Sequence, residues 1–123
     1  PETGVSPRVR QLKRIAAELT RLVREGEPAF FMGDMNDAWH PQHALKQAGF
    51  LSCFAALGMQ SPPTFQCYPT ANVGPEMQTI TEAIDMIFAN RNARAVAAAV
   101  PHCYAGDIAP LDHWPVQAIY QLP

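Results

Sequence analysis

The sequence predicts an α+β fold in one domain of 123 residues. Three observations support this class: an amphipathic helical pattern at residues 7–26, a short uninterrupted apolar run at residues 29–32, and three later strand-like segments bounded by Pro, Gly or Asn. A helix, a buried strand, loops and several further strands fit this class. The 48% of hydrophobic residues is enough for a core, but no apolar stretch is long enough to cross a bilayer. We expect a single globular domain without a membrane span.

The first predicted element is a helix that begins at Pro7 and ends near Gly26. Ser6 is a favoured N-cap residue, and Pro7 fits the first helical position because its missing N–H costs nothing there. Apolar residues then recur at three- and four-residue steps: Val9, Leu12, Ile15, Ala16, Leu19, Leu22 and Val23. Basic residues occupy much of the remaining surface. Because Glu18 and Glu25 alternate with them, we interpret this surface as a solvated helix face rather than a phosphate-binding surface.

The middle of the chain predicts a buried strand, a short helix and a long loop. Ala29–Met32 is a continuous apolar run, which is typical of a strand buried on both faces. Residues 41–49 have the length of a short helix, whereas residues 50–58 fit either a turn and helix or a packed loop. Several prolines block a regular helix at residues 60–78, so we expect a long loop there.

Three further strands are predicted near the end of the chain. They cover residues 84–89, 94–100 and 116–122, and the second of them is a candidate edge strand. No internal repeat or low-complexity linker divides the sequence. One domain therefore accounts for all of the predicted elements.

Charge and cysteine content limit the classes of function. Nine basic against eleven acidic residues give a net charge of -2, so no global positive field indicates a nucleic-acid-binding protein. A polyanionic substrate would have to be held by a metal and a few local groups. The three cysteines, Cys53, Cys67 and Cys103, show no CxxC spacing, which favours reduced thiols and an intracellular compartment.

Two candidate site residues follow the buried strand directly. Asp34 and Asn36 lie two positions apart at its exit, so both side chains leave on the same side of the chain. A carboxylate beside an amide suits a water nucleophile that lies next to a phosphate group. We therefore expect these two side chains to converge on one small volume.

Two further candidate segments accompany the later strands. Asp85 interrupts the apolar run at residues 84–88, and a lone acid in such a strand is costly unless a cationic or hydrogen-bonding group compensates it. Asp112 and His113 precede the last predicted strand and bring a hard oxygen ligand and an imidazole into one loop. His113 is therefore the expected partner of Asp85.

In this order, three segments resemble signature segments of the endonuclease/exonuclease/phosphatase superfamily, which has the deoxyribonuclease-I-like fold. The segments are Gly33-Asp34-Met35-Asn36, Ile84-Asp85-Met86-Ile87-Phe88 and Asp112-His113-Trp114-Pro115-Val116. Met35 stands where the family usually has Phe or Leu, Met86 where it commonly has Tyr, and Leu111 where it has Ser. The resemblance spans nearly the whole chain.

The resemblance implies a phosphodiesterase, nuclease or phosphatase that depends on Mg²⁺, with Mn²⁺ as an alternative ion, and that hydrolyses phosphate esters by in-line attack of an activated water. Asp34 would orient and deprotonate the water, and Asn36 would bind the nucleophile or a phosphoryl oxygen. Protonated His113 would stabilise the growing charge, and Asp85 would fix its ring. Asp112, together with Asp34, would bind the metal.

The resemblance also implies what surrounds the chain. The family fold is a four-layer α/β/β/α sandwich, and residues 1–123 resemble its C-terminal half, with flanking helices and mainly one antiparallel or mixed sheet. No segment matches the metal-binding Glu and the Asn of the family's N-terminal half. A lone half-sandwich would leave an apolar sheet face in water. We therefore expect a partner, either the absent N-terminal half or a second copy of this chain.

The expected ligand is a phosphate ester, with nucleic acid among the candidates. DNA, RNA, phospholipid headgroups and inositol phosphates are all served by similar sites, because specificity lies in the loops. The rival interpretation is a catalytically incomplete half-domain that serves as a binding or assembly module. Retention of several costly polar residues together favours the enzyme.

Weaker candidates have ordinary structural alternatives. His40 and His43 have a spacing that suits one metal, although a solvated pair is the more common outcome. The three cysteines and His102 are candidates for a zinc site, but their spacings show no ligand signature. Trp39 and Trp114 lie beside the expected site, where they either stack on bases or pack under the loops.

Overall fold

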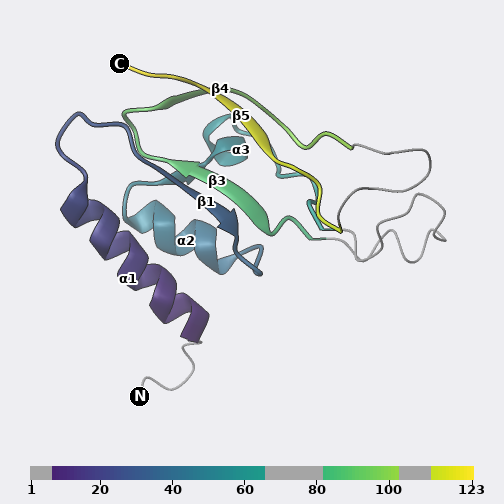
Figure 1. Cartoon of the computed structure of the whole chain (residues 1–123), viewed down its shortest axis with the longest axis horizontal. Coiled ribbons are helices and arrows are strands. Elements are labelled where there is room, and N and C mark those ends of the chain that lie inside the picture. The colour runs from purple at the N-terminus through teal and green to yellow at the C-terminus, as the bar shows by residue number, and fades with distance from the viewer. Residues whose placement is uncertain (1–6, 66–81, 103–111) are drawn as a thin grey trace.

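The computed structural model describes residues 7–65, 82–102 and 112–123, and it confirms the α+β class (Figure 1). The elements in chain order are α1 (Pro7–Leu22), β1 (Phe30–Asp34), α2 (His40–Gln47), β2 (Leu51–Ser52), α3 (Cys53–Ala56), β3 (Asp85–Ala89), β4 (Arg94–Ala99) and β5 (Gln117–Gln121). None of the described helices is long and apolar enough to cross a membrane. Four residues singled out in the sequence lie outside these ranges: Ser6, Cys67, Cys103 and Leu111.

The first helix forms as predicted and buries the face that the sequence predicts. α1 buries Leu12 and Ala16, which belong to the predicted apolar stripe. The helix ends at Leu22 rather than near Gly26. Gly26 instead has φ of 80° in the turn toward β1, a backbone conformation that glycine adopts without a steric penalty.

The segment at residues 50–58, which the sequence left open between two alternatives, forms a helix, with a short strand in place of the predicted turn before it. It contains the short strand β2 followed by α3. The Ser52 side chain is the N-cap of α3, because its hydroxyl accepts a hydrogen bond from the Ala55 N–H at 3.3 Å. The predicted short helix before this segment is α2, and it is confirmed.

The described strands form two antiparallel sheets, where the sequence predicts mainly one. β3 is the centre of a three-stranded sheet with β1 and β2, and β4 pairs with β5. A turn after β3 separates the two sheets, since the Ala93 N–H donates to the Asn90 carbonyl at 3.2 Å. The Asn90 side chain also binds backbone groups of Glu27 and Ala29, which fixes this turn beside the start of β1.

The two faces of the β1–β3 pair have different surroundings. The register places Phe31 opposite Phe88 and Met32 opposite Ile87, so paired side chains lie on the same face. The face with Phe31 and Phe88 packs against α1 and α2, which lie together on one side of the sheet in Figure 1. The buried core consists of Leu12, Ala16, Met35, Ala44, Leu45, Phe50, Met86 and Phe88. The other face carries Met32 and Ile87.

The prediction that the first strand is buried on both faces is wrong. Met32 is 60% exposed, and Phe30 is also exposed although its ring packs edge-on against Tyr120 of β5, with ring centroids 5.0 Å apart. On the second sheet, the apolar side chains of Val96 and Ile119 are also exposed. The continuous apolar run of β1 therefore marks a strand whose second face the described elements leave open.

Because Phe88 is buried and Ile119 is exposed, substitutions at these two positions should change the free energy of unfolding by very different amounts. Phe88 is 0% exposed at the centre of the three-stranded sheet, so Phe88→Ala should lower the free energy of unfolding by about 3–5 kcal/mol. Ile119 is 63% exposed, so Ile119→Ala should change it by less than about 0.5 kcal/mol. Denaturant unfolding followed by circular dichroism measures both values. Equal losses in the two variants would contradict the assignment of the core.

Candidate active site

The site is built on two carboxylates that face each other across β1 and β3. Asp34 and Asp85 are direct partners in the antiparallel register, so their side chains leave the same face of the sheet. Like charges directly opposite each other destabilise a strand pair. A positive group close to both would therefore stabilise this end of the sheet.

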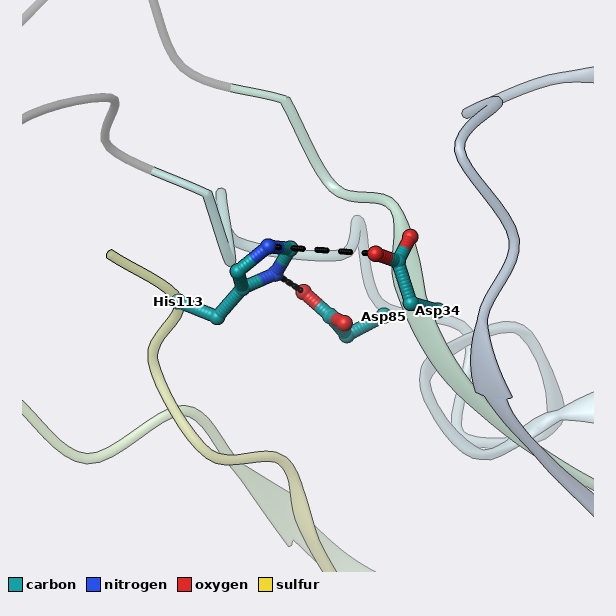
Figure 2. Close-up of side chains that lie close together, drawn as sticks. All are labelled: Asp34, Asp85 and His113. Atoms are coloured by element: carbon teal, nitrogen blue, oxygen red, sulfur yellow. Dashed lines mark hydrogen bonds and ion pairs between the residues drawn. The ribbon is translucent and has the colours of Figure 1, made fainter. Parts of the chain in front are cut away.

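His113 supplies that group from the segment before β5 (Figure 2). Its Nδ1 lies 2.7 Å from Asp85 Oδ2, and its Nε2 lies 3.8 Å from Asp34 Oδ2. An ionised carboxylate only accepts hydrogen bonds, so Nδ1–H donates to Asp85 while Nε2 faces Asp34. The predicted contact between Asp85 and His113 is confirmed.

The surrounding carboxylates favour the protonated imidazole. The hydrogen bond to Asp85 is the largest influence and raises the pKa of His113, whereas partial burial opposes this effect. The charges of Asp85, Asp34 and Asp112 raise the pKa further, and the net result lies above the ordinary value of 6.5. Asp112 acts at short range, because its Oδ1 is 3.9 Å from His113 Nε2. One imidazole ring thus faces three carboxylates.

Thr64 holds together the backbone on both sides of the site, and the sequence reasoning missed it. This residue is 1% exposed. Its hydroxyl accepts hydrogen bonds from the N–H groups of Ile84 and Asp85, both at 3.0 Å, and donates to the Glu82 carbonyl at 3.3 Å. Its carbonyl accepts from the Trp114 N–H at 2.6 Å. Thr64 therefore links the strand of the second carboxylate to the loop of the imidazole.

No pattern in the sequence marks Thr64 as part of the site. The partners of its hydroxyl lie 18 to 21 residues away along the chain, so neither helical nor strand periodicity reveals them. The next residue, Phe65, packs its ring against His113 with centroids 4.9 Å apart. Both residues precede a segment outside the described ranges, within the loop that the sequence predicts.

Asn36 lies beside Asp34 at the start of the loop after β1. Its N–H donates to Asp34 Oδ1 at 2.9 Å, and its φ of 52° is in the left-handed region, where Asn is enriched among non-glycine residues. Its carbonyl accepts a hydrogen bond from Arg8 Nη1 at 2.9 Å. The structure thus places Asn36 next to the carboxylates, while its predicted role toward the nucleophile stays a prediction.

The donor groups fit a hard divalent cation. Asp34, Asp85 and His113 offer ligand atoms that lie within 4.8 Å of one another. Asp112 is not one of these three residues, although its Oδ1 lies 3.9 Å from His113 Nε2, so its predicted role as a metal ligand stays a prediction. Carboxylate oxygens are typical ligands of Mg²⁺, which usually keeps several waters. Asp34, Asp85 and His113 all border an open pocket of ≈ 510 Å³. The rest of its lining is apolar and consists of Met32, Gly33, Met86, Ile87, Trp114, Pro115 and Val116.

The weaker metal candidates do not converge within the described residues. His40 Nδ1 lies 2.7 Å from Asp37 Oδ2, and His43 Nε2 lies 3.3 Å from Gln47 Nε2. The two imidazoles therefore contact different groups. Cys53 is buried, and the other two cysteines lie outside the described residues, so the zinc alternative stays untested.

The two tryptophans have opposite environments. Trp114 is buried, as the packing alternative predicts, and His102 stacks on its ring with centroids 4.4 Å apart. Trp39 is 82% exposed at the start of α2. Packing under a loop therefore does not apply to Trp39.

Three solved structures have a similar fold. A mannosyl-6-phosphatase from Bacteroides thetaiotaomicron VPI-5482 aligns with a TM-score of 0.71 at 18% identity, over 98% of this chain and 48% of that chain. An AP endonuclease from Archaeoglobus fulgidus gives 0.69 at 18%, over 93% and 53%. An endonuclease/exonuclease/phosphatase family protein from Bacteroides thetaiotaomicron gives 0.67 at 18%, over 94% and 46%. No family model and no curated protein matches the sequence.

These similarities confirm the fold resemblance that the three sequence segments predict. The chain spans about half the length of the solved structures that it matches. Its fold therefore corresponds to about half of each of these solved structures. Identities of 18% show the fold alone, so reaction and residue roles need their own tests.

The pKa of His113 provides the first test of the site. NMR titration in the presence of a chelator should give a value above 6.5, and Asp85→Asn should lower it because the largest cause of the shift is removed. Since the folded-state pKa is raised, the stability contributed by the pair is fully present below pH 6.5 and is lost as the pH rises through the folded-state pKa. An unchanged pKa in Asp85→Asn would contradict the pairing.

Thr64 provides the second test. Thr64→Val keeps the side-chain shape but leaves the buried Ile84 N–H and the partly buried Asp85 N–H without their acceptor, so it should lower the free energy of unfolding by about 1–3 kcal/mol. The amides of Ile84 and Asp85 should also exchange faster with solvent. Thr64→Ser keeps the hydroxyl and is the matched control. Equal stability and equal amide protection in Val and Ser variants would show that the hydroxyl does not hold the site.

Proposed function

We propose that this chain, with its endonuclease/exonuclease/phosphatase fold, carries catalytic residues of a metal-dependent hydrolase of phosphate esters, and that phosphodiesterase or nuclease activity is the first candidate. The observation that carries this proposal is the cluster of Asp34, Asp85 and His113 at the edge of an open pocket. Ionisable groups gathered in such a place are typical of functional sites. Two proteins with a similar fold are, by name, a phosphatase and an endonuclease, which supports this class of reaction.

The geometry suggests a role for each group. Asp34 is open to solvent and lies next to the imidazole, so it is the candidate base that orients and deprotonates the attacking water. His113 presents Nε2 to the same space and would stabilise negative charge that develops on the phosphoryl oxygens. Asp85 would act as a positioning residue, because it holds the ring through Nδ1. Asn36 would bind the nucleophile or a phosphoryl oxygen.

The metal would be held by carboxylates on the polar side of the pocket. Asp112 and Asp34 are the candidate ligands for Mg²⁺, with Mn²⁺ as the alternative ion, since both carboxylates approach the same Nε2 atom. When bound, such an ion neutralises charge on the phosphate group. In this arrangement Asp85 holds the imidazole and does not bind the metal, so ring positioning and metal binding use different carboxylates.

The uncovered sheet face supports the proposal that a partner polypeptide binds there. Met32 on this face is 60% exposed, and Val96 and Ile119 on the second sheet are also more than half exposed. Large exposed apolar surfaces usually mark interaction sites. The solved structures with this fold are about twice as long as this chain. The partner would be the other half of the domain or a second copy of the chain.

The same observations keep the second candidate function open. A half-domain that lacks part of its site would serve as a binding or assembly module rather than as an enzyme. It shares the exposed sheet face with the first candidate but does not need the carboxylate cluster. Hydrolysis assays therefore separate the two functions.

The proposed hydrolase function predicts that the protein cleaves at least one substrate in a panel of single-stranded RNA, DNA and small phosphate esters, and that this cleavage requires Mg²⁺. Asp34→Ala should lower turnover by about 10²–10⁴-fold, and a chelator should abolish it. Asp85→Asn should also lower turnover while folding stays nearly intact, because the ring loses its orienting charge. His43→Gln, outside the cluster, is the control. Activity that survives both Asp34→Ala and the chelator would refute the proposal.

If a partner polypeptide covers the open sheet face, this chain should associate in a concentration-dependent way. Analytical ultracentrifugation should show either self-association or a one-to-one complex with a polypeptide that supplies the other half of the domain. Met32→Lys should weaken that association, because it places a charge in the open apolar face of β1. A well-folded monomer that binds neither polypeptide would contradict the prediction. Absence of hydrolysis together with a stable complex would favour the assembly module.

A further inference from the structure

A second pocket lies beside the site, and the proposed hydrolysis does not use it. It has a volume of ≈ 550 Å³, and its lining includes Arg8, Asn36, Asp37, Trp39, Gln60 and Glu82. Asn36 connects this pocket to the carboxylate cluster, since its N–H donates to Asp34 Oδ1 at 2.9 Å. A substrate held at Asp34 therefore has a neighbouring cavity for the group that its phosphate carries.

Trp39 is the most unusual residue of this pocket, because its large indole is 82% exposed. Its backbone is nevertheless fixed: Asp37 Oδ1 accepts from the N–H groups of Trp39 and His40, at 2.8 and 3.1 Å, and Asp37 Oδ2 contacts His40 Nδ1. Burial acts to raise the pKa of Asp37, but these hydrogen bonds outweigh it and lower the pKa, so the carboxylate stays ionised. An exposed aromatic ring carried on a fixed backbone is suited to stacking.

The polar groups of the pocket include donors and acceptors of the kind that bind the edge of a nucleobase. Arg8 is anchored by its hydrogen bond to the Asn36 carbonyl, and a guanidinium has five N–H donors in a planar fork. Glu82 contributes a carboxylate acceptor, and Gln60 contributes both a donor and an acceptor. Nucleobases combine a flat π face with donors and acceptors along one edge. A second phosphate group fits less well, because it would meet the charge of Glu82.

We propose that Trp39 and Arg8 form a subsite that binds a nucleobase next to the phosphate held at Asp34. The indole stacks on the base, and the guanidinium bonds to its edge. The position of this subsite relative to the scissile bond rests on the proposed function. The substrate class is then a nucleotide-type phosphate ester rather than a phospholipid or an inositol phosphate.

The test uses neutral ligands, so that it does not depend on hydrolysis. Two-dimensional NMR of this chain follows the indole N–H signals of its two tryptophans, assigned with Trp39→Phe, during titration with adenosine or with ribose. Adenosine should shift the Trp39 signal and leave that of buried Trp114 unchanged, whereas ribose, which lacks the base, should shift neither. Trp39→Ala should weaken adenosine binding by about 5- to 100-fold, and Trp39→Phe should retain most of it.

Several outcomes would overturn the subsite. Equal shifts with ribose and adenosine would identify a sugar site instead, and no shift with either ligand would remove the base-binding role of Trp39. Unchanged affinity in Trp39→Ala would place the base elsewhere.

Arg8→Gln should weaken adenosine binding without unfolding the chain, because Arg8 is exposed. Since no phosphate or metal takes part, a failed hydrolysis assay leaves this result unaffected.

Discussion

Two carboxylates placed directly opposite each other in a strand pair are the constraint on which the rest of this structure depends. The β1–β3 register makes Asp34 and Asp85 neighbours on one face, and their mutual repulsion would favour another arrangement if nothing opposed it. His113 opposes it by donating Nδ1–H to one carboxylate while Nε2 faces the other. The stability of this end of the sheet and the chemistry of the site therefore have the same origin.

The surrounding fold serves this arrangement from two directions. α1 and α2 pack on the Phe88 face of the three-stranded sheet and fix β1 against β3. On the other side, the buried hydroxyl of Thr64 and its carbonyl join the strand of Asp85 to the loop of the imidazole. The carboxylates lie where the apolar, uncovered face of the sheet ends. This location gives a polar site with an open pocket beside it.

Much of the fold could be predicted from local patterns, because the helices and strands follow residue periodicity and Pro, Gly and Asn boundaries. The contact between Asp85 and His113 was also predictable, since a lone acid in an apolar strand requires a partner. The open face of β1 was not predictable from the sequence. A continuous apolar run looks the same whether both faces of the strand are buried within one chain or one face is left open. Thr64 left no signal, since its hydrogen bonds join distant segments. The exposure of Trp39 depends on how the loop after Asn36 turns, which propensity does not reveal.

A double-mutant cycle on Asp85 and His113 tests the central claim most directly. The free energy of unfolding is measured for Asp85→Ala, His113→Ala and the double variant at a pH where the imidazole is charged. The double variant should lose less stability than the sum of the single losses, by at least about 0.5 kcal/mol, because each single change leaves a charge without its partner. Losses that simply add would show that the imidazole does not balance the opposed carboxylates.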